Sequence, residues 1–350
     1  MRRAIFSALV LAVCGAAGPA MADTPPSVWE RAKDKEVAEA YDLHRIVERR
    51  LSRPRLRSDI DEADWRRVRT MLEQAGAERS KDVRLRLDLA KVNGYLKSYA
   101  RAAEIYKGVL AENPQNPAIA EEVWISLAFA CGHVGDHDCE RKAYTEVLRR
   151  LTEEVFRGIP TLNLAETEMH LGNLKDAIEG YREALRIAGR GPSRDSAPLA
   201  VWGLAVALDR SGDHLGAEKE ARFAFELEGN RQRPPPSIGL SGLLHNYPQR
   251  PDREDAVFFV PDYEIRYYDG LGAIALARAA TSSHEALALW KLAETYFGAY
   301  VRGAENAKEK DRWLEHARAR LAYVKSEREK AEKRASKEAP PPPANLEIVF

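Results

Sequence analysis

The clearest pattern of apolar and polar positions along the chain lies between residues 161 and 188. Two amphipathic segments flank Leu171-Gly172-Asn173, a break that predicts a tight turn between two helices. In the second segment Ala177, Tyr181 and Ala184 recur at spacings of four and three residues, which is typical of one helix face. The pattern predicts a helical hairpin. Because one hairpin cannot bury its own apolar faces, neighbouring hairpins are expected.

The same pattern recurs with a nearly constant period. Repeats start near residues 83, 121, 158 and 198, and each has an apolar pair in its first helix and small residues in its second. The matching positions are Leu89-Ala90, Ala102 and Tyr106 in the first repeat, Leu127-Ala128, Gly135 and Tyr144 in the second, and Leu204-Ala205, Gly212 and Ala217 in the fourth. Four matches in series predict an all-α solenoid rather than isolated hairpins.

This register resembles the tetratricopeptide repeat (TPR), whose usual period is about 34 residues. The resemblance implies a right-handed superhelix of helical hairpins with a concave groove. Tyr267-Tyr268, Leu271-Gly272 and Trp290 fit a degenerate fifth repeat. A long capping helix is expected near residues 308–336, and its polar second half predicts a helix that closes the solenoid against solvent.

The expected organisation of the chain has six consecutive parts. They are an export signal (1–22), an atypical N-terminal helix pair (23–80), four TPR-like repeats (81–228), a Pro-rich insertion (229–263), the degenerate fifth repeat with the capping helix (264–337), and a Pro-rich tail (338–350).

Two apolar segments outside the repeats need a place to be buried. Val257–Val260 lies in the insertion, and we expect it to pack on the solenoid, with the groove as one place for it. Leu346–Phe350 in the tail is either a docking segment or a disordered end. Whether one of these segments fills the groove is left open by the pattern.

The first residues have the pattern of an export signal. A pair of arginines precedes an apolar stretch at residues 5–17, and the small-residue site Ala20-Met21-Ala22 predicts cleavage after Ala22. The mature chain is then expected to be periplasmic or secreted. Lipid attachment at Cys14 is an alternative, but Val13 stands where a lipobox has a small residue. No later apolar run is long enough for a transmembrane segment.

Charge and motifs narrow the expected function. The chain has 54 Lys and Arg and 54 Asp and Glu residues, so its formal net charge is zero and no nucleic-acid partner is expected. The basic stretch 44–57 is best explained as a solvated helix face. The sequence has no Gly-x-Ser-x-Gly elbow, His-Glu-x-x-His motif, phosphate loop or dinucleotide fingerprint, so we expect no enzymatic activity and no cofactor.

Cys131 and Cys139 are the only cysteines of the predicted mature chain. The resemblance places them opposite each other across the second hairpin, and an oxidising compartment after export favours a disulfide. Two reduced core thiols are a second interpretation. Zinc bound by both cysteines with His133 and His137 is a third, but its ligand spacing matches no common zinc finger, and we predict no metal site.

The resemblance also implies that the first helices of the repeats line the groove. The groove residues carried over in this way are Ile125, Phe129, Leu162, Glu166, Met169, Trp202, Val206 and Arg210. An apolar stripe with isolated charges fits an extended or helical peptide, and Trp202 is the expected anchor. The same side chains could instead contact neighbouring helices or be covered by Val257–Val260 or by the tail.

The sequence therefore predicts an exported, non-enzymatic TPR adaptor or scaffold that binds another envelope protein or a peptide in its groove. An accessory or carbohydrate-binding protein in envelope or cell-wall assembly is the alternative, because the Tyr and Trp residues between 263 and 290 could stack on sugars. The patterns do not name the partner, the process or the oligomeric state.

Overall fold

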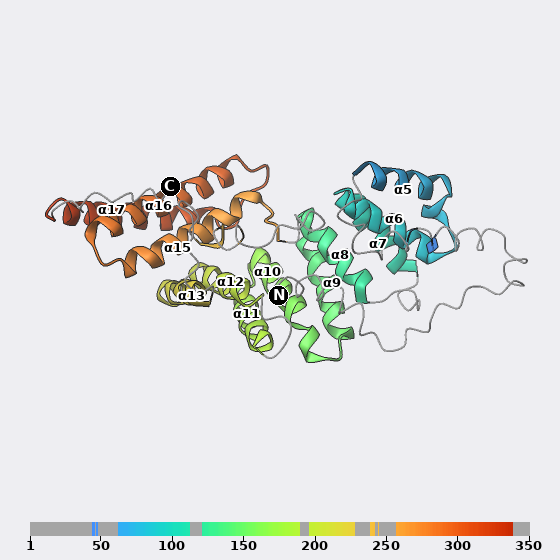
Figure 1. Ribbon diagram of the computed structural model, residues 1–350, viewed down its shortest axis with the longest axis horizontal. Coiled ribbons are helices and arrows are strands. Elements are labelled where there is room, and N and C mark those ends of the chain that lie inside the picture. Colours follow the sequence, from blue (N-terminus) through green and yellow to red (C-terminus); the bar gives the residue numbers. More distant parts are fainter. Residues whose placement is uncertain are drawn as a thin grey trace, which may run out of the picture. The chain divides into compact units, whose positions relative to one another are not determined.

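The structure, a computed structural model, describes residues 44–45, 47, 62–112, 121–189, 196–227, 239–241, 244 and 257–338 (Figure 1). The predicted export signal with Cys14, most of the N-terminal helix pair, most of the Pro-rich insertion, and residues 339–350 of the tail lie outside the described residues. Every regular element within the described ranges is helical, which confirms the prediction of an all-α fold.

The described residues form two compact units. Unit 1 holds those up to 171 together with 183–189 and 257–260, and unit 2 holds 172–182, 196–227, 239–241, 244 and 261–338. The division passes through one helix, α11 (Leu174–Ala188).

Unit 1 is built from consecutive helices. They are α5 (Glu62–Gln74), η1 (Ala77–Arg79), α6 (Val83–Tyr95), α7 (Tyr99–Glu112), α8 (Glu121–His133), α9 (His137–Arg150), η2 (Glu154–Phe156) and α10 (Gly158–Leu171). Unit 2 contains α12 (Ala197–Arg210), α13 (His214–Leu227), η5 (Asp262–Glu264), α15 (Ile265–Ala279), α16 (Ser283–Asn306) and α17 (Leu314–Ala335). Helices α6, α8, α10 and α12 begin at or beside the predicted repeat starts.

Small residues let the two helices of a hairpin approach each other closely. Ala90 on α6, Ala102 on α7, Ala128 on α8 and Ala217 on α13 have no exposed surface. Helix α6 packs on α7, α8 on α9, and α12 on α13, while α7 packs on α8 and α9 on α10, so each hairpin of unit 1 also covers the next one (Figure 1). Stacking of this kind buries the apolar faces that a single hairpin leaves in water.

Glycine allows the tight turn inside two of the hairpins. Gly135, between α8 and α9, has a φ of 73°, and Gly212, between α12 and α13, has a φ of 94°. Both values lie in the left-handed region, where a side chain would be strained and where helices commonly end. Directly after Gly135, Asp136 caps α9 because its side chain accepts a hydrogen bond from the Cys139 N–H at 3.1 Å.

The C-terminal helices differ from the expectation in two respects. Helix α16 continues to Asn306, and α17 begins at Leu314, later than the predicted start near residue 308. Helix α17 also carries a buried stripe along its length, and because this stripe includes Ala331 and Ala335, the second half is not purely solvent-facing; its members are Ala317, Val324, Ala331 and Ala335. Spacings of seven and four residues place these small side chains on one helix face.

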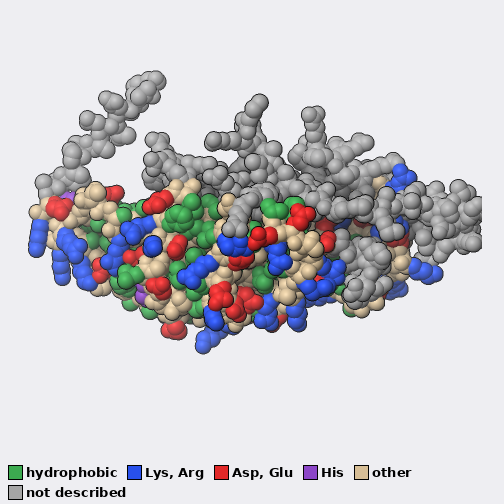
Figure 2. Space-filling view, turned by 90° about the horizontal axis from the view of Figure 1, so that it is seen from below, with side chains coloured by type: hydrophobic (Ala, Val, Ile, Leu, Met, Phe, Trp, Pro, Cys, Tyr) green, Lys and Arg blue, Asp and Glu red, His purple; other side chains and the backbone are tan. Residues whose placement is uncertain are grey.

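None of the described helices combines the length and the apolar character that crossing a membrane requires. Figure 2 shows acidic and basic side chains interspersed over the face that it draws, in keeping with the equal numbers of the two charges.

Candidate functional site

An aromatic cluster at the C-terminal end of α8 is the best-formed candidate site of unit 1. It consists of Tyr99, Phe129, His133 and Phe258. The His133 ring stacks on Tyr99, with centroids 3.9 Å apart and an interplanar angle of 4°. Phe129 meets the edge of His133 at 4.5 Å and the edge of Tyr99 at 5.9 Å. Rings in these stacked and edge-to-face geometries stabilise one another beyond the apolar area that they bury.

The fourth ring of the cluster comes from a distant part of the chain. Phe258 stacks on His133, with ring centroids 3.6 Å apart, and meets Phe129 edge-to-face at 5.4 Å. It belongs to Val257–Val260, which we call the docked segment. The prediction that this apolar run packs on the helices agrees with these contacts.

Two glycines of the second repeat leave room for the docked segment. A Cβ on Gly132 would lie 3.2 Å from the ring tip of Phe258, and a Cβ on Gly135 would lie 3.7 Å from the Cγ1 of Val260. The segment therefore follows the end of α8 and the turn after it. Residues 257–260 are not helical, so a segment without regular structure lies in contact with a helix.

A buried carboxylate lies next to this surface. Glu140 on α9 is 9% exposed, and its Oε2 lies 2.9 Å from Nδ1 of His137, with which it forms a hydrogen bond. His137 in turn stacks on His170 of α10, with centroids 4.6 Å apart and an interplanar angle of 2°. This polar row follows the turns of the second and third repeats.

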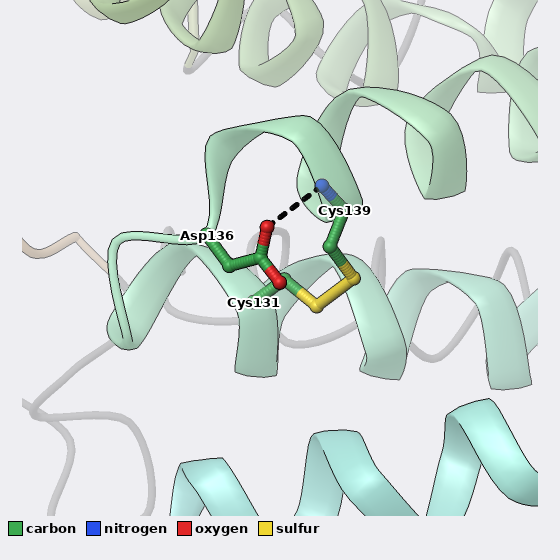
Figure 3. A group of neighbouring side chains, drawn as sticks. All are labelled: Cys131, Asp136 and Cys139. Atoms are coloured by element: carbon green, nitrogen blue, oxygen red, sulfur yellow. Dashed lines mark hydrogen bonds between the residues drawn. A yellow bond between two sulfur atoms is a disulfide. The ribbon is translucent and has the colours of Figure 1, made fainter.

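Cys131 and Cys139 are joined by a disulfide between the end of α8 and the first turn of α9 (Figure 3). Their Cα atoms are 5.9 Å apart, which is within the range that a disulfide spans without backbone movement. Figure 3 also shows Asp136 beside the two sulfur atoms, with its carboxylate turned toward the backbone nitrogen of Cys139. The bond ties the two helices together at the turn beside the aromatic cluster.

The zinc alternative needs a ligand set that the structure does not assemble. The sulfur atoms lie within 4.8 Å of each other and of a carboxylate oxygen of Asp136, so the potential donors are Cys131, Asp136 and Cys139. The two histidines expected as ligands are engaged elsewhere, because the ring of His133 lies in the aromatic cluster and His137 bonds Glu140.

A surface hollow of about 390 Å³ lies beside the disulfide, between α7, α8 and α9. Lys107 and Asp136 form an ion pair of 2.8 Å at its edge, and the hydrogen bond from Lys107 lowers the pKa of the Asp136 carboxyl. Trp124, Leu127 and Cys139 contribute apolar surface to its wall.

The remaining groove residues of unit 1 differ in accessibility. Ile125 is partly exposed like Phe129, and Glu166 is partly exposed on α10. Leu162 and Met169, at 7% and 0% exposed, are core residues of α10. Among the predicted groove residues of unit 1, Ile125, Phe129 and Glu166 are therefore the ones that offer surface to a ligand.

The predicted anchor Trp202 is a core residue. Neither Trp202 nor Val206 on α12 has exposed surface, and a Cβ on Gly272 of α15 would come within 3.0 Å of the Trp202 ring. A peptide can anchor only on a side chain that it can reach, so we correct the assignment of these two residues from groove lining to core of unit 2. Helix α15 lies where an open groove was expected.

Arg210 is also buried rather than groove-lining. Its guanidinium lies over the rings of Tyr267 and Trp313, at 4.9 and 4.8 Å from their centroids, and its Nη2 donates to Glu264 Oε1 at 2.6 Å. The ion pair and the aromatic faces compensate the charge inside unit 2. This corrects the expectation that Arg210 is one of the isolated charges of an open groove.

The neighbouring Asp209 is the centre of a buried polar network. Tyr267 donates to it at 2.6 Å, His214 hydrogen-bonds it at 2.8 Å, and Arg320 of α17 lies 3.2 Å away. Burial by itself raises the pKa of Asp209, but hydrogen bonds from His214 and His316 and the charge of Arg320 hold that pKa well below its usual range. The network links α12, α13, α15 and α17, so its role is to hold the helices of unit 2 together.

The aromatic residues proposed for sugar stacking are mostly buried. Tyr267, Tyr268 and Trp290 are 0%, 3% and 4% exposed. A sugar stacks on an exposed ring face, so these three side chains are core residues and not sugar platforms, whereas Tyr263 is partly exposed.

The sequence pattern did not indicate Tyr99, whose ring stacks on His133 in the cluster. Tyr99 is the first residue of α7, and its aromatic character was the only available signal. The sequence pattern suggested His133 only as a possible zinc ligand. The ring stack depends on the tertiary structure, because its members come from α7, from α8 and from residue 258.

No protein-family model and no curated protein sequence matches this chain. Solved structures with a similar course include MamA (MSR-1), which is 18% identical, with 55% of this chain and 97% of that chain covered and a TM-score of 0.43. A tetratricopeptide repeat protein from Parabacteroides merdae is 12% identical, with 83% and 98% covered and a TM-score of 0.42. The Rap protein complexed with Competence and Sporulation Factor is 13% identical, with 86% and 77% covered and a TM-score of 0.41.

The described helices pack in consecutive pairs, which is the arrangement that the resembled repeat implies. The compared structures are all below 20% identity and below a TM-score of 0.5, so the functional argument rests on this chain's own residues.

Proposed function

We propose that this protein is an exported, non-enzymatic scaffold that binds a segment of another envelope protein on the surface formed by Phe129 and His133. The observation that supports this function is the docked segment itself. Phe258 lies against the Tyr99–His133 stack at 3.6 Å and against Phe129 at 5.4 Å, so this surface accommodates a non-helical apolar segment.

The surface has the properties of a peptide-binding site. Aromatic side chains provide large contact area with few torsions to fix on binding, and such residues often dominate the binding energy of interfaces. Gly132 and Gly135 keep the end of α8 and its turn free of side-chain bulk. The disulfide holds the same turn in place, which lowers the entropic cost of ordering the site on binding.

A crosslinked pull-down from envelope extract tests this function. The mature chain from residue 23 to 350 is compared with its Phe129→Glu variant, which places a charge in the aromatic cluster, and with Met71→Glu. Met71 on α5 is 45% exposed, so the second variant adds the same charge at a position away from the cluster.

A protein captured by the unaltered chain and by Met71→Glu, and lost from Phe129→Glu, supports the proposal. Circular dichroism of each variant verifies that the helices are intact. Equal capture by all three chains would place the binding surface elsewhere.

A further inference from the structure

The aromatic cluster is a binding surface that its own chain already covers. Phe258 contacts both Phe129 and His133, two partly exposed residues of α8. A partner that uses the same rings must therefore replace Phe258 before it can bind.

The contacts of the docked segment describe the chemistry that the surface accepts. One flat ring stacks on His133, whose other face lies on Tyr99 with an interplanar angle of only 4°. The tip of that ring reaches the space above Gly132, and a β-branched side chain two residues later lies near Gly135. An aromatic residue followed at the second position by Val or Ile satisfies both places.

The docked segment also has the properties of a replaceable occupant. Residues 257–260 are each partly exposed rather than buried, although Val257, Phe258, Phe259 and Val260 are all apolar. They make up a short segment outside the helices, whereas the core residues of the neighbouring hairpins are almost fully buried. Fewer buried contacts mean a lower free energy of local opening.

We infer that Val257–Val260 is an intramolecular competitor for the aromatic cluster, and that the external ligand is an extended peptide of the same chemistry, with an aromatic residue next to β-branched residues. This inference rests on the proposed function, because it names the ligand class and the regulation of the same surface. Being part of the same chain gives the docked segment a high effective concentration, so it lowers the apparent affinity for any external peptide.

Fluorescence anisotropy with a labelled peptide of residues 255–262 (Asp-Ala-Val-Phe-Phe-Val-Pro-Asp) tests the inference. The receptors are the mature chain, its Phe258→Ala variant, the double variant Phe258→Ala/Phe129→Glu, and Phe223→Ala. Phe223 on α13 is 42% exposed, so Phe223→Ala is the same substitution at a position outside the cluster. Phe258→Leu keeps the apolar bulk and removes the aromatic face, and it serves as a second variant where Phe258→Ala impairs folding.

The expected result is that Phe258→Ala binds the peptide about tenfold more tightly than the unaltered chain, which corresponds to occupation of the cluster by the docked segment for about nine-tenths of the time. Phe258→Leu should shift in the same direction, Phe223→Ala should not shift, and the double variant should lose binding. A peptide with Asp in place of Phe258 should not bind.

Two results would overturn the inference. If the unaltered chain and Phe258→Ala bound the peptide with equal affinity, the docked segment would not be a competitor. Loss of peptide binding in the double variant would in that case still support the aromatic cluster as the binding site. Absence of binding to every chain would exclude this ligand class. If the pull-down still captured a protein through Phe129, the proposed function would stand although the inference about the ligand had failed.

Discussion

The guanidinium of Arg210 and the carboxylate of Glu264 form an ion pair of 2.6 Å in which the two side chains are 0% and 2% exposed. Arg210 lies at the end of α12 and Glu264 in η5, and the rings of Tyr267 and Trp313 cover the guanidinium. A residue that the repeat register assigns to an open groove is therefore part of the interior of unit 2.

Removing one partner of this pair should destabilise unit 2. Glu264→Gln leaves the Arg210 charge buried without its counter-ion, and we expect a loss of about 3–5 kcal/mol in the free energy of unfolding. Replacing both residues by methionine should cost less than Glu264→Gln, because no uncompensated charge remains. Urea denaturation followed by circular dichroism measures the difference.

An exposed ion pair provides the control for this prediction. Arg318 and Glu305 lie 2.7 Å apart with 45% and 43% of their side chains exposed. Glu305→Gln should change stability by less than about 1 kcal/mol. Equal effects of the two Glu→Gln substitutions would contradict the role assigned to Arg210 and Glu264.

Asp209 should make the stability of unit 2 depend on acid pH. Its pKa is lower in the folded protein than the value of about 3.9 expected in the unfolded chain. The ionised carboxylate therefore stabilises the fold above about pH 4, and this stabilisation is lost as the pH falls from there toward the folded pKa. Asp209→Asn should be less stable by about 3 kcal/mol at pH 7 and should lose less stability on acidification.

Urea midpoints measured from pH 7 to pH 3 test this pH dependence. Glu315→Gln, at a side chain that is 76% exposed, is the control and should follow the unaltered chain. If the urea midpoint fell equally steeply with decreasing pH in Asp209→Asn and in the unaltered chain, another titrating group would be the cause of the acid sensitivity.

The disulfide should protect both cysteines from alkylation. Intact mass of chain 23–350, which lacks Cys14, should show no added label after treatment of the non-reduced protein with iodoacetamide, and reduction should make Cys131 and Cys139 reactive. The paired substitution Cys131→Ser/Cys139→Ser is expected to lower stability by about 2 kcal/mol, since the closed loop is short. Two labelled thiols in unreduced protein would exclude the bond in solution.

Close helix packing should make one glycine far less tolerant than another. A Cβ on Gly203 of α12 would lie 2.2 Å from the ring of Tyr181, so Gly203→Ala should destabilise unit 2 by about 1–3 kcal/mol. Gly94 on α6 has no atom within 4 Å of the corresponding position, and Gly94→Ala should be neutral or stabilising by up to about 1 kcal/mol. Thermal unfolding of both variants compares them directly, and a similar loss in both would contradict the packing argument.

Local pattern was sufficient to predict the hairpins. Alternation of apolar and small residues at helical spacing, and glycine at the turns, depend on neighbours within one or two turns of helix, so Ala128, Gly135 and Gly212 could be assigned from the sequence. The apolar run at 257–260 was recognised in the same way, because its need for burial follows from its composition.

The candidate site could be predicted only in part, because its contacts join residues that are far apart in the sequence. The repeat register assigns Phe129 to the groove, yet the ring partner of Phe129 and His133, Phe258, is separated from them by more than a hundred residues of sequence. Likewise the environment of Trp202 depends on α15, which the sequence pattern does not place over α12.

By itself, the sequence determined the helical hairpins, their order and their small-residue interfaces, because these follow from periodicity, turn chemistry and side-chain size over short stretches. Only the tertiary structure decided which inward-facing residues contact solvent and which contact the chain itself. Arg210 is buried against Glu264 and Trp202 beneath α15, while Phe129 carries Phe258, because burial is decided by residues that meet across long separations in the chain.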